Sequence, residues 1–347
     1  MKTIITGGAG FIGSNASSRY LTRGHRVVVV DNLSRDGVAE NLEWLRSLGG
    51  ELEFHQIDVR ESGEVSRVFR EHRDADQVLH LAAQVAVTTS VKDPREDFEI
   101  NALGTFNVLE ALRQSKMRAP LIYSSTNKVY GEMTGVGTVE RNGRYDYHAL
   151  PTGVSEDHNL DFHSPYGCSK GSADQYAIDY HRIYGLRSIV FRQSCIYGYR
   201  QFGAEDQGWV AWFMIATQLG RPITIYGDGK QVRDILFIDD LLDAYDAAFA
   251  QPDRAAGRAF NIGGGVNNVV SLRELLAFIE QRSGSKIRAG SADWRPGDQK
   301  VFISDIRRAK AELGWSPKID CPRGLGLLYD WIEKNRELFI KLSPSLV

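Results

Sequence analysis

A run of glycines between an apolar strand and a helical pattern constrains the fold of this chain more than any other feature. Gly7, Gly10 and Gly13 follow the short apolar segment Thr3–Thr6. Such glycines allow a tight turn, a close approach of a pyrophosphate to the backbone and tight packing of the next helix. A plain strand-to-helix turn carries similar glycines, but Asp31 closes the next predicted strand, and this context favours a dinucleotide cradle.

Short apolar runs alternate with segments of helical periodicity through the first half of the chain. This alternation predicts an α/β fold with a Rossmann-type doubly wound parallel sheet. The expected strands are Thr3–Thr6, Arg26–Asp31, Leu52–Gln56, Gln77–Leu81, Leu121–Ser124 and Ser188–Arg192. The expected helices are Phe11–Leu21, Ala39–Leu48, Val65–His72, Phe98–Ser115 and Pro165–Tyr184, with Gly24 and Gly49 at helix ends.

The pattern loosens after residue 193, where we expect a smaller C-terminal, substrate-binding lobe. The predicted Rossmann domain spans residues 1–193, and residues 232–262 return to it, with Val232–Ile238 as a strand of the main sheet. Residues 194–347 form the smaller lobe. It contains a helix that opens on the capping box of Ser271 and Glu274, and a terminal helix at Tyr329–Leu338. The polar stretch Glu132–Ser164 is predicted to be a loop over the active site.

The composition excludes several classes of partner. The 347 residues carry a net charge of -2, which gives no reason to expect nucleic acid or an anionic membrane as partner. Cys168, Cys195 and Cys321 lack the spacing of a metal or redox motif, so we expect reduced thiols and no bound metal. The strand that starts directly after Met1-Lys2 leaves no room for a signal peptide, so we expect a cytoplasmic protein.

Tyr166 and Lys170 form the candidate reaction centre. Their spacing places a phenol and an ammonium one helical turn apart on the same face. A phenol with an ordinary pKa of about 10 is a poor base at neutral pH, but Lys170 and a positively charged nicotinamide would both favour the phenolate. Thr126, at the end of the fifth predicted strand, is placed to hold the substrate oxygen. A surface Tyr and Lys on an ordinary helix is the simpler alternative.

Asp31 favours NAD over NADP, because a carboxylate accepts hydrogen bonds from the ribose hydroxyls and repels a 2'-phosphate. Arg35 is the residue that argues for NADP, unless it is a solvated loop arginine. Asp58 and Val59, after the third strand, are candidates for the adenine site. The full set predicted to bind the cofactor is Gly7, Gly10, Phe11, Ile12, Gly13, Asp31, Asn32, Ser34, Arg35, Asp58, Val59, Leu81, Ala82, Ala83, Gln84, Asn101, Ser124, Tyr166, Lys170 and Gln193.

These motifs together resemble the nucleotide-sugar epimerase and dehydratase branch of the extended short-chain dehydrogenases/reductases. The resemblance covers nearly the whole chain and includes Asn101–Thr105, Arg233–Asp240, Asn261–Gly264 and Arg295–Asp298. It implies NAD as cofactor, a nucleotide-diphosphate sugar as substrate, a homodimer, and Arg233 and Arg295 as clamps on the diphosphate. The residues that it assigns to the substrate are Thr126, Asn127, Gln193, Cys195, Gln201, Gln207, Gly208, Val210, Tyr226, Arg233, Arg295 and Asp298.

At a finer level the chain resembles the CDP-paratose 2-epimerases, also called CDP-tyvelose 2-epimerases. Gln84–Ser90, Ser124–Gly131, Leu160–Gly171 and Asp206–Val210 carry this resemblance, which implies inversion at carbon 2 of a CDP-sugar such as CDP-paratose or CDP-glucose. Sugar 4,6-dehydratases follow the Thr with an Asp-Glu pair, whereas this chain has Asn127-Lys128, so elimination of water is not expected. Cys195 replaces an Asn that contacts the diphosphate in many relatives.

Two alternatives remain open at this point. One is a UDP-sugar 4-epimerase, or another nucleotide-sugar oxidoreductase, built on the same residues. The other is a non-catalytic regulator that senses NAD, for which Thr126, Tyr166 and Lys170 would be dispensable.

Overall fold

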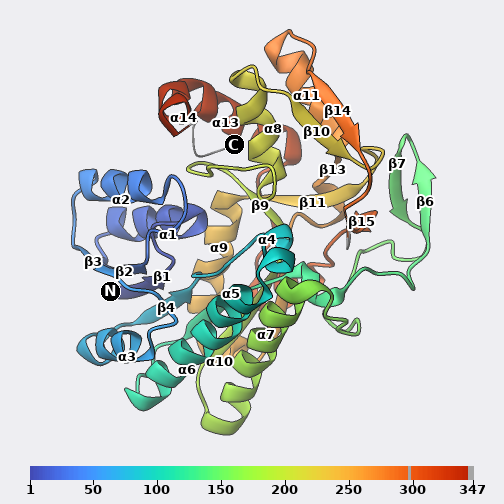
Figure 1. Cartoon of the computed structure of the whole chain (residues 1–347). Coiled ribbons are helices and arrows are strands. Elements are labelled where there is room, and N and C mark those ends of the chain that lie inside the picture. The colour runs from blue at the N-terminus through green and yellow to red at the C-terminus, as the bar shows by residue number, and fades with distance from the viewer. Residues whose placement is uncertain (296–297, 343–347) are drawn as a thin grey trace.

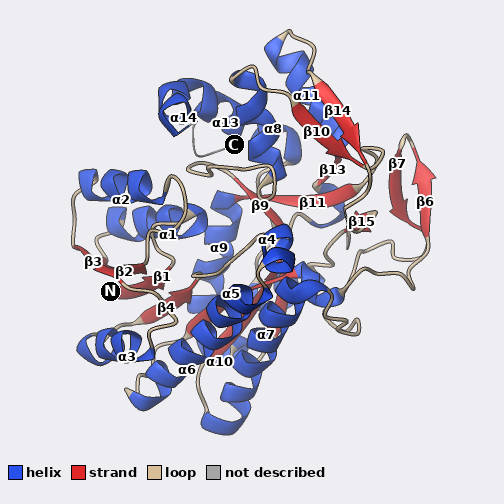
Figure 2. Cartoon of the chain, in the orientation of Figure 1, coloured by secondary structure: helices blue, strands red, loops and turns tan. Residues whose placement is uncertain are grey.

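Seven parallel strands form the main sheet of the protein, whose computed structural model describes residues 1–295 and 298–342. The strand order is β12-β8-β5-β4-β1-β2-β3. Figures 1 and 2 label β1, β2, β3 and β4 of this sheet. Their bounds are β1 Lys2–Thr6, β2 Arg26–Asp31, β3 Leu52–Gln56, β4 Gln77–His80, β5 Leu121–Thr126, β8 Ser188–Gln193 and β12 Ala259–Ile262. The order reverses at β1, which pairs with β2 on one side and β4 on the other. Such a reversal opens a crevice at the carboxyl ends of the strands.

Alternate residues of each strand pack on opposite faces of this sheet. Ile5, Val27 and Val29 face α1 (Phe11–Thr22), α2 (Val38–Ser47) and α9 (Ile238–Phe249). Ile4, Val28 and Val30 face the other layer, which contains α3 (Ser62–Glu71), α6 (Gly104–Gln114) and α7 (Ser164–Tyr184). Strands that are apolar on both faces need helices on both sides, as Figure 1 shows. The predicted Rossmann-type sheet is therefore confirmed, and so are its strands and most of its helices.

One predicted helix is interrupted. The segment predicted as a single helix at Phe98–Ser115 consists of α5 (Pro94–Phe98), the π-helical turn η1 (Glu99–Leu103) and α6. Thr105 Oγ1 donates to the carbonyl of Asn101 at 2.6 Å within this turn, and the Asn101 side chain is buried. A π-helical turn shifts the register of the helix, and here it brings the Asn101 amide against the loop after β4.

A four-stranded sheet organises the second lobe. It contains β9 (Cys195–Tyr197), β11 (Val232–Phe237), β13 (Val269–Ser271) and β15 (Val301–Phe302). The prediction that Val232–Ile238 joins the main sheet is wrong, because β11 pairs with β9, β13 and β15. Only β12 of the segment 232–262 is a strand of the main sheet, at its edge beside β8. A short apolar strand can be buried equally well in either sheet, so the pattern alone did not decide between them.

Helices and a second strand pair complete this lobe. A parallel pair, β10 (Ile223–Tyr226) and β14 (Ala289–Ala292), lies beside α8 (Trp209–Gln218) and α11 (Leu272–Ser283) (Figure 1). The predicted capping box opens α11, and Gly284 closes it in the left-handed conformation. The predicted terminal helix begins earlier than expected, since Asp320 caps α13 (Cys321–Lys334) and a separate helix α14 (Arg336–Leu342) follows. The remaining short helices are α4 Val87–Lys92, α10 Pro252–Ala255, α12 Arg307–Leu313, η2 Asn127–Tyr130 and η3 Gly265–Asn267.

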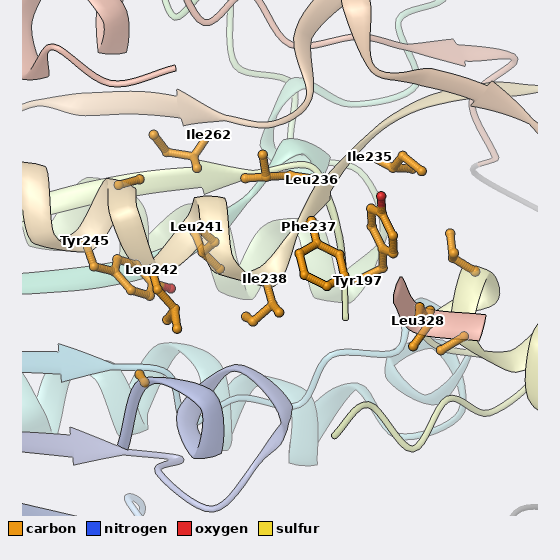
Figure 3. Packing of buried hydrophobic residues seen from close by; sticks show 14 of the residues in the cluster. Tyr197, Ile235, Leu236, Phe237, Ile238, Leu241, Leu242, Tyr245, Ile262 and Leu328 are labelled. Carbon is orange, nitrogen blue, oxygen red and sulfur yellow. The ribbon is translucent and has the colours of Figure 1, made fainter. Parts of the chain in front are cut away.

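One continuous apolar cluster joins the two lobes. Phe237 and Tyr197 from the small sheet and Leu328 from α13 lie close together, next to Ile238 and Leu241 at the start of α9 (Figure 3). The backbone itself also crosses here, because β8 of the main sheet ends at Gln193 and β9 of the small sheet starts at Cys195. The residues at this crossing therefore lie between the main sheet and the second lobe.

The stretch from 132 to 164 is not the loop over the active site that the sequence predicts. It contains a hairpin of β6 (Thr138–Arg141) and β7 (Arg144–Tyr147), which stands beside the second lobe in Figure 1. Asn142 and Gly143 connect the strands, both with positive φ. Tyr147 and Val154 pack into an apolar cluster with residues of β11 and β15.

Candidate active site

A cavity of about 570 Å³ opens at the carboxyl ends of the central strands. Its walls come from the glycine turn after β1, the ends of β2, β4, β5 and β8, the start of α7, and residues 200–207. The cavity contains 19 of the 20 residues predicted to bind the cofactor; Asn101 is the exception. It also contains the three predicted catalytic residues, Thr126, Tyr166 and Lys170. Gly10 and Lys170, which are 160 positions apart in sequence, thus line the same cavity.

The glycine turn is shaped for a ligand that approaches the backbone. A Cβ at Gly13 would lie 2.0 Å from the carbonyl oxygen of Gly7, and a Cβ at Gly7 would lie 2.6 Å from the amide nitrogen of Ala82, so neither position accepts a side chain. Gly10 differs, because a Cβ there would meet only the Gly7 oxygen at 3.3 Å and would otherwise extend into the cavity. Gly10 is also the N-cap of α1, and a helix N-terminus attracts phosphate. This geometry fits a dinucleotide pyrophosphate.

Asp31 and Asp58 form the end of the cavity where an adenosine would lie. Asp31 is buried at the end of β2, where it accepts hydrogen bonds from the amides of Ala9 (3.1 Å) and Leu33 (2.9 Å), and burial raises its pKa. The Asp58 carboxylate accepts from Asn32 (2.9 Å) and Arg60. These bonds outweigh the effect of burial and lower the pKa of Asp58 to about 2.

Asn101 acts on the cavity through another residue. Its side chain accepts from the Gln84 amide (3.0 Å) and donates to the Gln84 carbonyl (3.0 Å), which fixes the loop after β4. It also donates to Asp97, a buried carboxylate that accepts from Ser169 of α7 at 2.5 Å. Asn101 therefore positions Gln84 and ties the loop to the helix that carries Tyr166.

Tyr166 and Thr126 face each other across the cavity floor. Burial raises the pKa of the Tyr166 phenol to about 12, while its hydrogen bond with Thr126 acts in the opposite direction. The nearby Asp97 raises the pKa further, and the positive charge of Arg35 lowers it. Arg35, which the sequence predicted as a cofactor-binding residue that argues for NADP or as a solvated loop arginine, is thus the cation whose charge acts on the phenol in this structure.

The Lys170 ammonium donates a hydrogen bond to the carbonyl of Ser124 at 2.5 Å. Its ammonium also lies 4.4 Å from the centre of the Tyr123 ring. Burial lowers the pKa of Lys170 to about 7, while Asp97 and Asp174 raise it. The expected direct effect of Lys170 on the Tyr166 pKa is not seen among these contacts.

A buried ion pair supports the strand that carries Thr126, and sequence reasoning missed it. Arg192 of β8 makes two hydrogen bonds of 3.0 Å to Asp174 of α7, and both side chains are almost fully buried. Ser125 of β5 donates to the same carboxylate at 2.7 Å. The pair locks β5, β8 and α7 together one residue away from Thr126. No local motif signals it, because the partners come from different elements.

The residues predicted to bind substrate fall into three places. Thr126, Gln193, Gln201 and Gln207 line the cavity. The Gln201 side chain is buried, and its Oε1 makes no hydrogen bond with any described residue, so it offers an acceptor toward a ligand. Asn127 lies beside them, within 3.3 Å of the Thr126 hydroxyl. The others lie farther out, in the second lobe.

Arg233 and Arg295 occupy separate positions in that lobe. Arg233 donates to Asp298 at 2.6 Å, next to Cys195, whose pKa is raised by burial and lowered by Arg233. Arg295 lies 3.8 Å from the centre of the Tyr226 ring and near the carboxylate of Asp206. Val210 and Gly208 belong to α8 and its N-cap. Pro296 and Gly297 of the Arg295–Asp298 motif lie outside the described residues.

A segment of the second lobe, residues 200–208, closes over the adenosine end of the cavity. The Arg200 guanidinium lies 4.1 Å from the centre of the Trp44 ring on α2. Phe202 packs on Gly37, where an added Cβ would lie 2.2 Å from its ring. Gln207 accepts a hydrogen bond from Arg35 at 3.2 Å. The segment therefore forms the outer wall of the predicted cofactor site.

Comparisons with known proteins point to one family. The family described as GDP-mannose 4,6 dehydratase matches residues 4–326. CDP-paratose 2-epimerase of Salmonella typhi is 47% identical over 336 residues, which cover 95% of this chain and 99% of that protein. The structure of UDP-glucose 4-epimerase from Thermotoga maritima with UDP-glucose superposes with a TM-score of 0.83 at 31% identity, covering 97% of this chain and all of that one. UDP-glucose 4-epimerase of Thermus thermophilus, solved with NAD, gives a TM-score of 0.80 at 32% identity, covering 96% and 99%.

Proposed function

Because the chain belongs to the family described as GDP-mannose 4,6 dehydratase, within the extended short-chain dehydrogenases/reductases, we propose that it inverts carbon 2 of a CDP-sugar. At the coarser level the protein is an NAD-dependent nucleotide-sugar epimerase. The choice of carbon 2 and of CDP rests on the 47% identity to CDP-paratose 2-epimerase, which extends over nearly the whole length of both chains.

The arrangement of Thr126 and Tyr166 beside the glycine turn is the observation that supports the proposed oxidation of a sugar hydroxyl. Tyr166 is placed to remove the proton of a sugar hydroxyl and to return a proton at the end of the cycle. Thr126, hydrogen-bonded to the same phenol, holds the reacting oxygen. NAD, when bound, supplies a reversible acceptor and donor of hydride, so there is no net redox change.

Arg35 provides positive charge near the phenol, whereas Lys170 has a separate role beside the cofactor. Lys170 lies in the cavity floor, one turn of α7 beyond Tyr166, where it can hold the nicotinamide ribose. Arg35 lowers the Tyr166 pKa through its charge. Inversion requires the oxidised sugar, a 2-keto intermediate, to present its second face, which means that the sugar turns while its diphosphate stays anchored. We assign that anchor to Arg233 and Arg295.

Asn127 and Lys128 argue against a dehydratase reaction at this site. Elimination of water needs an acid and a base next to the sugar, and neither an amide nor an ammonium replaces a pair of carboxyl groups. Burial and the charge of Arg233 lower the pKa of Lys128 to about 8. Lys128 thus adds positive charge on the Arg233 side of the site, which suits a diphosphate.

Product analysis tests the proposal directly. The protein is incubated with CDP-paratose, CDP-tyvelose, CDP-glucose and UDP-glucose, and the products are identified by proton NMR. We expect epimerisation at carbon 2 of a CDP-sugar only. Conversion of UDP-glucose to UDP-galactose would instead assign a 4-epimerase, the activity named for relatives of 30 and 34% identity.

Isotope transfer separates hydride return from deprotonation of the carbon. In deuterated water, we expect the product to keep protium at carbon 2, because the hydride removed from that carbon is returned to it. Incorporation of solvent deuterium at carbon 2 would contradict the mechanism and favour a carbanion route.

We also propose a homodimer through α6 and α7. Phe106 of α6 packs edge-to-face on Tyr176 and Tyr180 of α7, and Tyr176 is 52% exposed. Ile183 and Tyr184 continue this apolar surface at the end of α7. An exposed aromatic ridge of this kind is typical of a protein–protein interface.

Among the described residues, no helix is long and apolar enough to span a membrane.

A further inference from the structure

A second cluster of ligand-type side chains lies on the edge strand of the main sheet, away from the catalytic cavity. Glu53 and His55 are two residues apart on β3, so their side chains share one face of the strand. His72 is the C-cap residue of α3, and its ring lies 3.2 Å from Glu53. One oxygen or nitrogen from each of the three residues lies within 4.8 Å of the other two.

The distances within the cluster match those between neighbouring ligands of one metal ion. Glu53 Oε1 lies 3.0 Å from His55 Nε2 and 3.2 Å from His72 Nε2. In a tetrahedral zinc site with bonds of about 2.0–2.1 Å, neighbouring ligand atoms are separated by roughly 3.3 Å. Two imidazoles and a carboxylate are also a donor set that suits Zn²⁺.

His72 provides the observation that distinguishes a metal site from an ordinary hydrogen-bonded cluster. The residue is 4% exposed, and neither of its ring nitrogens makes a hydrogen bond with a described residue, although Nε2 is 3.2 Å from the Glu53 carboxylate. Buried polar atoms without hydrogen bonds are rare and costly. Glu53 Oε1 is hydrogen-bonded to His55 Nε2 at 3.0 Å, so His72 Nε2, which lies 3.2 Å from the same oxygen without a hydrogen bond, is the atom that a shared metal ion would satisfy.

The surrounding charges leave one carboxylate oxygen available. Arg26 binds the other oxygen of Glu53, Oε2, at 2.7 Å. Lys2 is paired with Asp74 at 2.6 Å, so its charge is largely compensated. Oε1 therefore faces the two imidazoles, where it is hydrogen-bonded to His55, and the contact from Arg26 to Oε2 orients the carboxylate.

We infer that Glu53, His55 and His72 form a three-ligand site for Zn²⁺. Glu53 and His55 are partly exposed, which leaves a fourth position for water. The ion connects the end of α3 to the edge strand β3. It plays no part in the epimerase reaction, because the cavity is lined by the opposite, carboxyl ends of the strands.

Zinc titration of the full chain, purified without a metal-binding tag and stripped with a chelator, tests this site. Equilibrium dialysis against ZnCl₂ should give one ion per chain, with an increase in Tm. His55→Asn should weaken binding at least about tenfold, as loss of one ligand requires. His148→Asn, at an exposed histidine of the 132–164 stretch, is the matched control and should bind as the parent does.

A second variant keeps the test independent of folding defects. Glu53→Gln removes the charged ligand at a partly exposed position and should also abolish binding of the ion. His72→Asn is not used, because it changes a buried side chain. Absence of stoichiometric binding, or binding unchanged in both His55→Asn and Glu53→Gln, would overturn the proposal. Turnover of the NAD-loaded variants should match that of the parent, so a failure of the epimerase assignment would appear separately.

Discussion

The Tyr166 phenol shows how its surroundings limit the chemistry at the scale of one residue. Burial, with a contribution from Asp97, raises its pKa to about 12 although the Thr126 hydrogen bond and the Arg35 charge act in the opposite direction, so the phenol is protonated at neutral pH. A bound nicotinamide would add a further positive charge and lower that pKa. The reactive phenolate is thus favoured only when the site is fully assembled.

Thr126→Val should move the pH dependence of turnover. Activity that needs the phenolate rises as the pH approaches the Tyr166 pKa, and loss of the Thr126 hydrogen bond raises that pKa. We expect the rising limb of the kcat profile to shift to higher pH, with Thr126→Ser close to the parent as control. A profile of lower amplitude at an unchanged position would contradict this role.

Tyr166→Phe should reduce kcat by about 10²–10⁴-fold, because it removes the general base. NAD content, measured after denaturation of the protein, should be unchanged. Full turnover in this variant would instead support the non-catalytic, NAD-sensing alternative.

The Arg192–Asp174 pair makes a different prediction, on stability. Arg192→Met leaves Asp174 buried without its partner and should lower the free energy of unfolding by about 3–5 kcal/mol. Arg182→Met, which breaks the exposed Arg182–Asp179 pair on α7, is the matched control and should cost less than about 1 kcal/mol. Urea unfolding of both variants measures the difference.

Sequence motifs predicted the residues that act within one local segment. The glycine turn, Asp31, and Tyr166 with Lys170 each have a fixed spacing, and the structure places all of them in the cavity. Asp97 and Arg192 were missed because each contacts a residue of a distant element. Asp97 binds Ser169 and Arg192 binds Asp174, and both partners belong to α7. The roles of Arg233 and Arg295 stay predictions, as no ligand contact defines them.

At the scale of elements, the segment 200–208 should control how fast the cofactor leaves. Its contact with α2 depends on the Arg200–Trp44 stacking, and Trp44 itself does not line the cavity. Trp44→Leu removes a cation–π contact of about 0.5–1 kcal/mol and should speed NAD release roughly two- to fivefold. Arg46→Ala, which removes the Arg46–Phe54 contact of the same helix, is the control. Stopped-flow displacement of NAD provides the rates.

Elements with a clear periodicity were predicted well, and elements set by tertiary contacts were not. The strands β1, β2 and β3 match within one residue, because their apolar runs are bounded by turns. The π-helical turn at 99–103 depends on contacts with Gln84, which helical periodicity does not encode. The 138–147 hairpin was missed although Asn142-Gly143 is a strong turn signal, since polar strands on the surface lack an apolar pattern.

At the scale of the whole molecule, the aromatic ridge on α6 and α7 predicts the oligomeric state. Light scattering should give twice the chain mass of 38.8 kDa. Phe106→Glu places a charge in the ridge and should yield monomers. Val266→Glu, at an exposed apolar residue of η3 in the second lobe, should leave the mass unchanged. A parent protein of single-chain mass would refute the dimer.

The crossing from β8 to β9 has a mechanical consequence. Only Ser194 separates the two strands, and its hydroxyl donates to the buried Asp234 of β11 at 2.5 Å. A connection of one residue that is hydrogen-bonded to β11 cannot act as a hinge between the wall that would face the nicotinamide and the wall that would hold the diphosphate. The site therefore keeps one shape, and the rotation that exposes the second face of the sugar has to occur about the bonds that join the sugar to its anchored diphosphate.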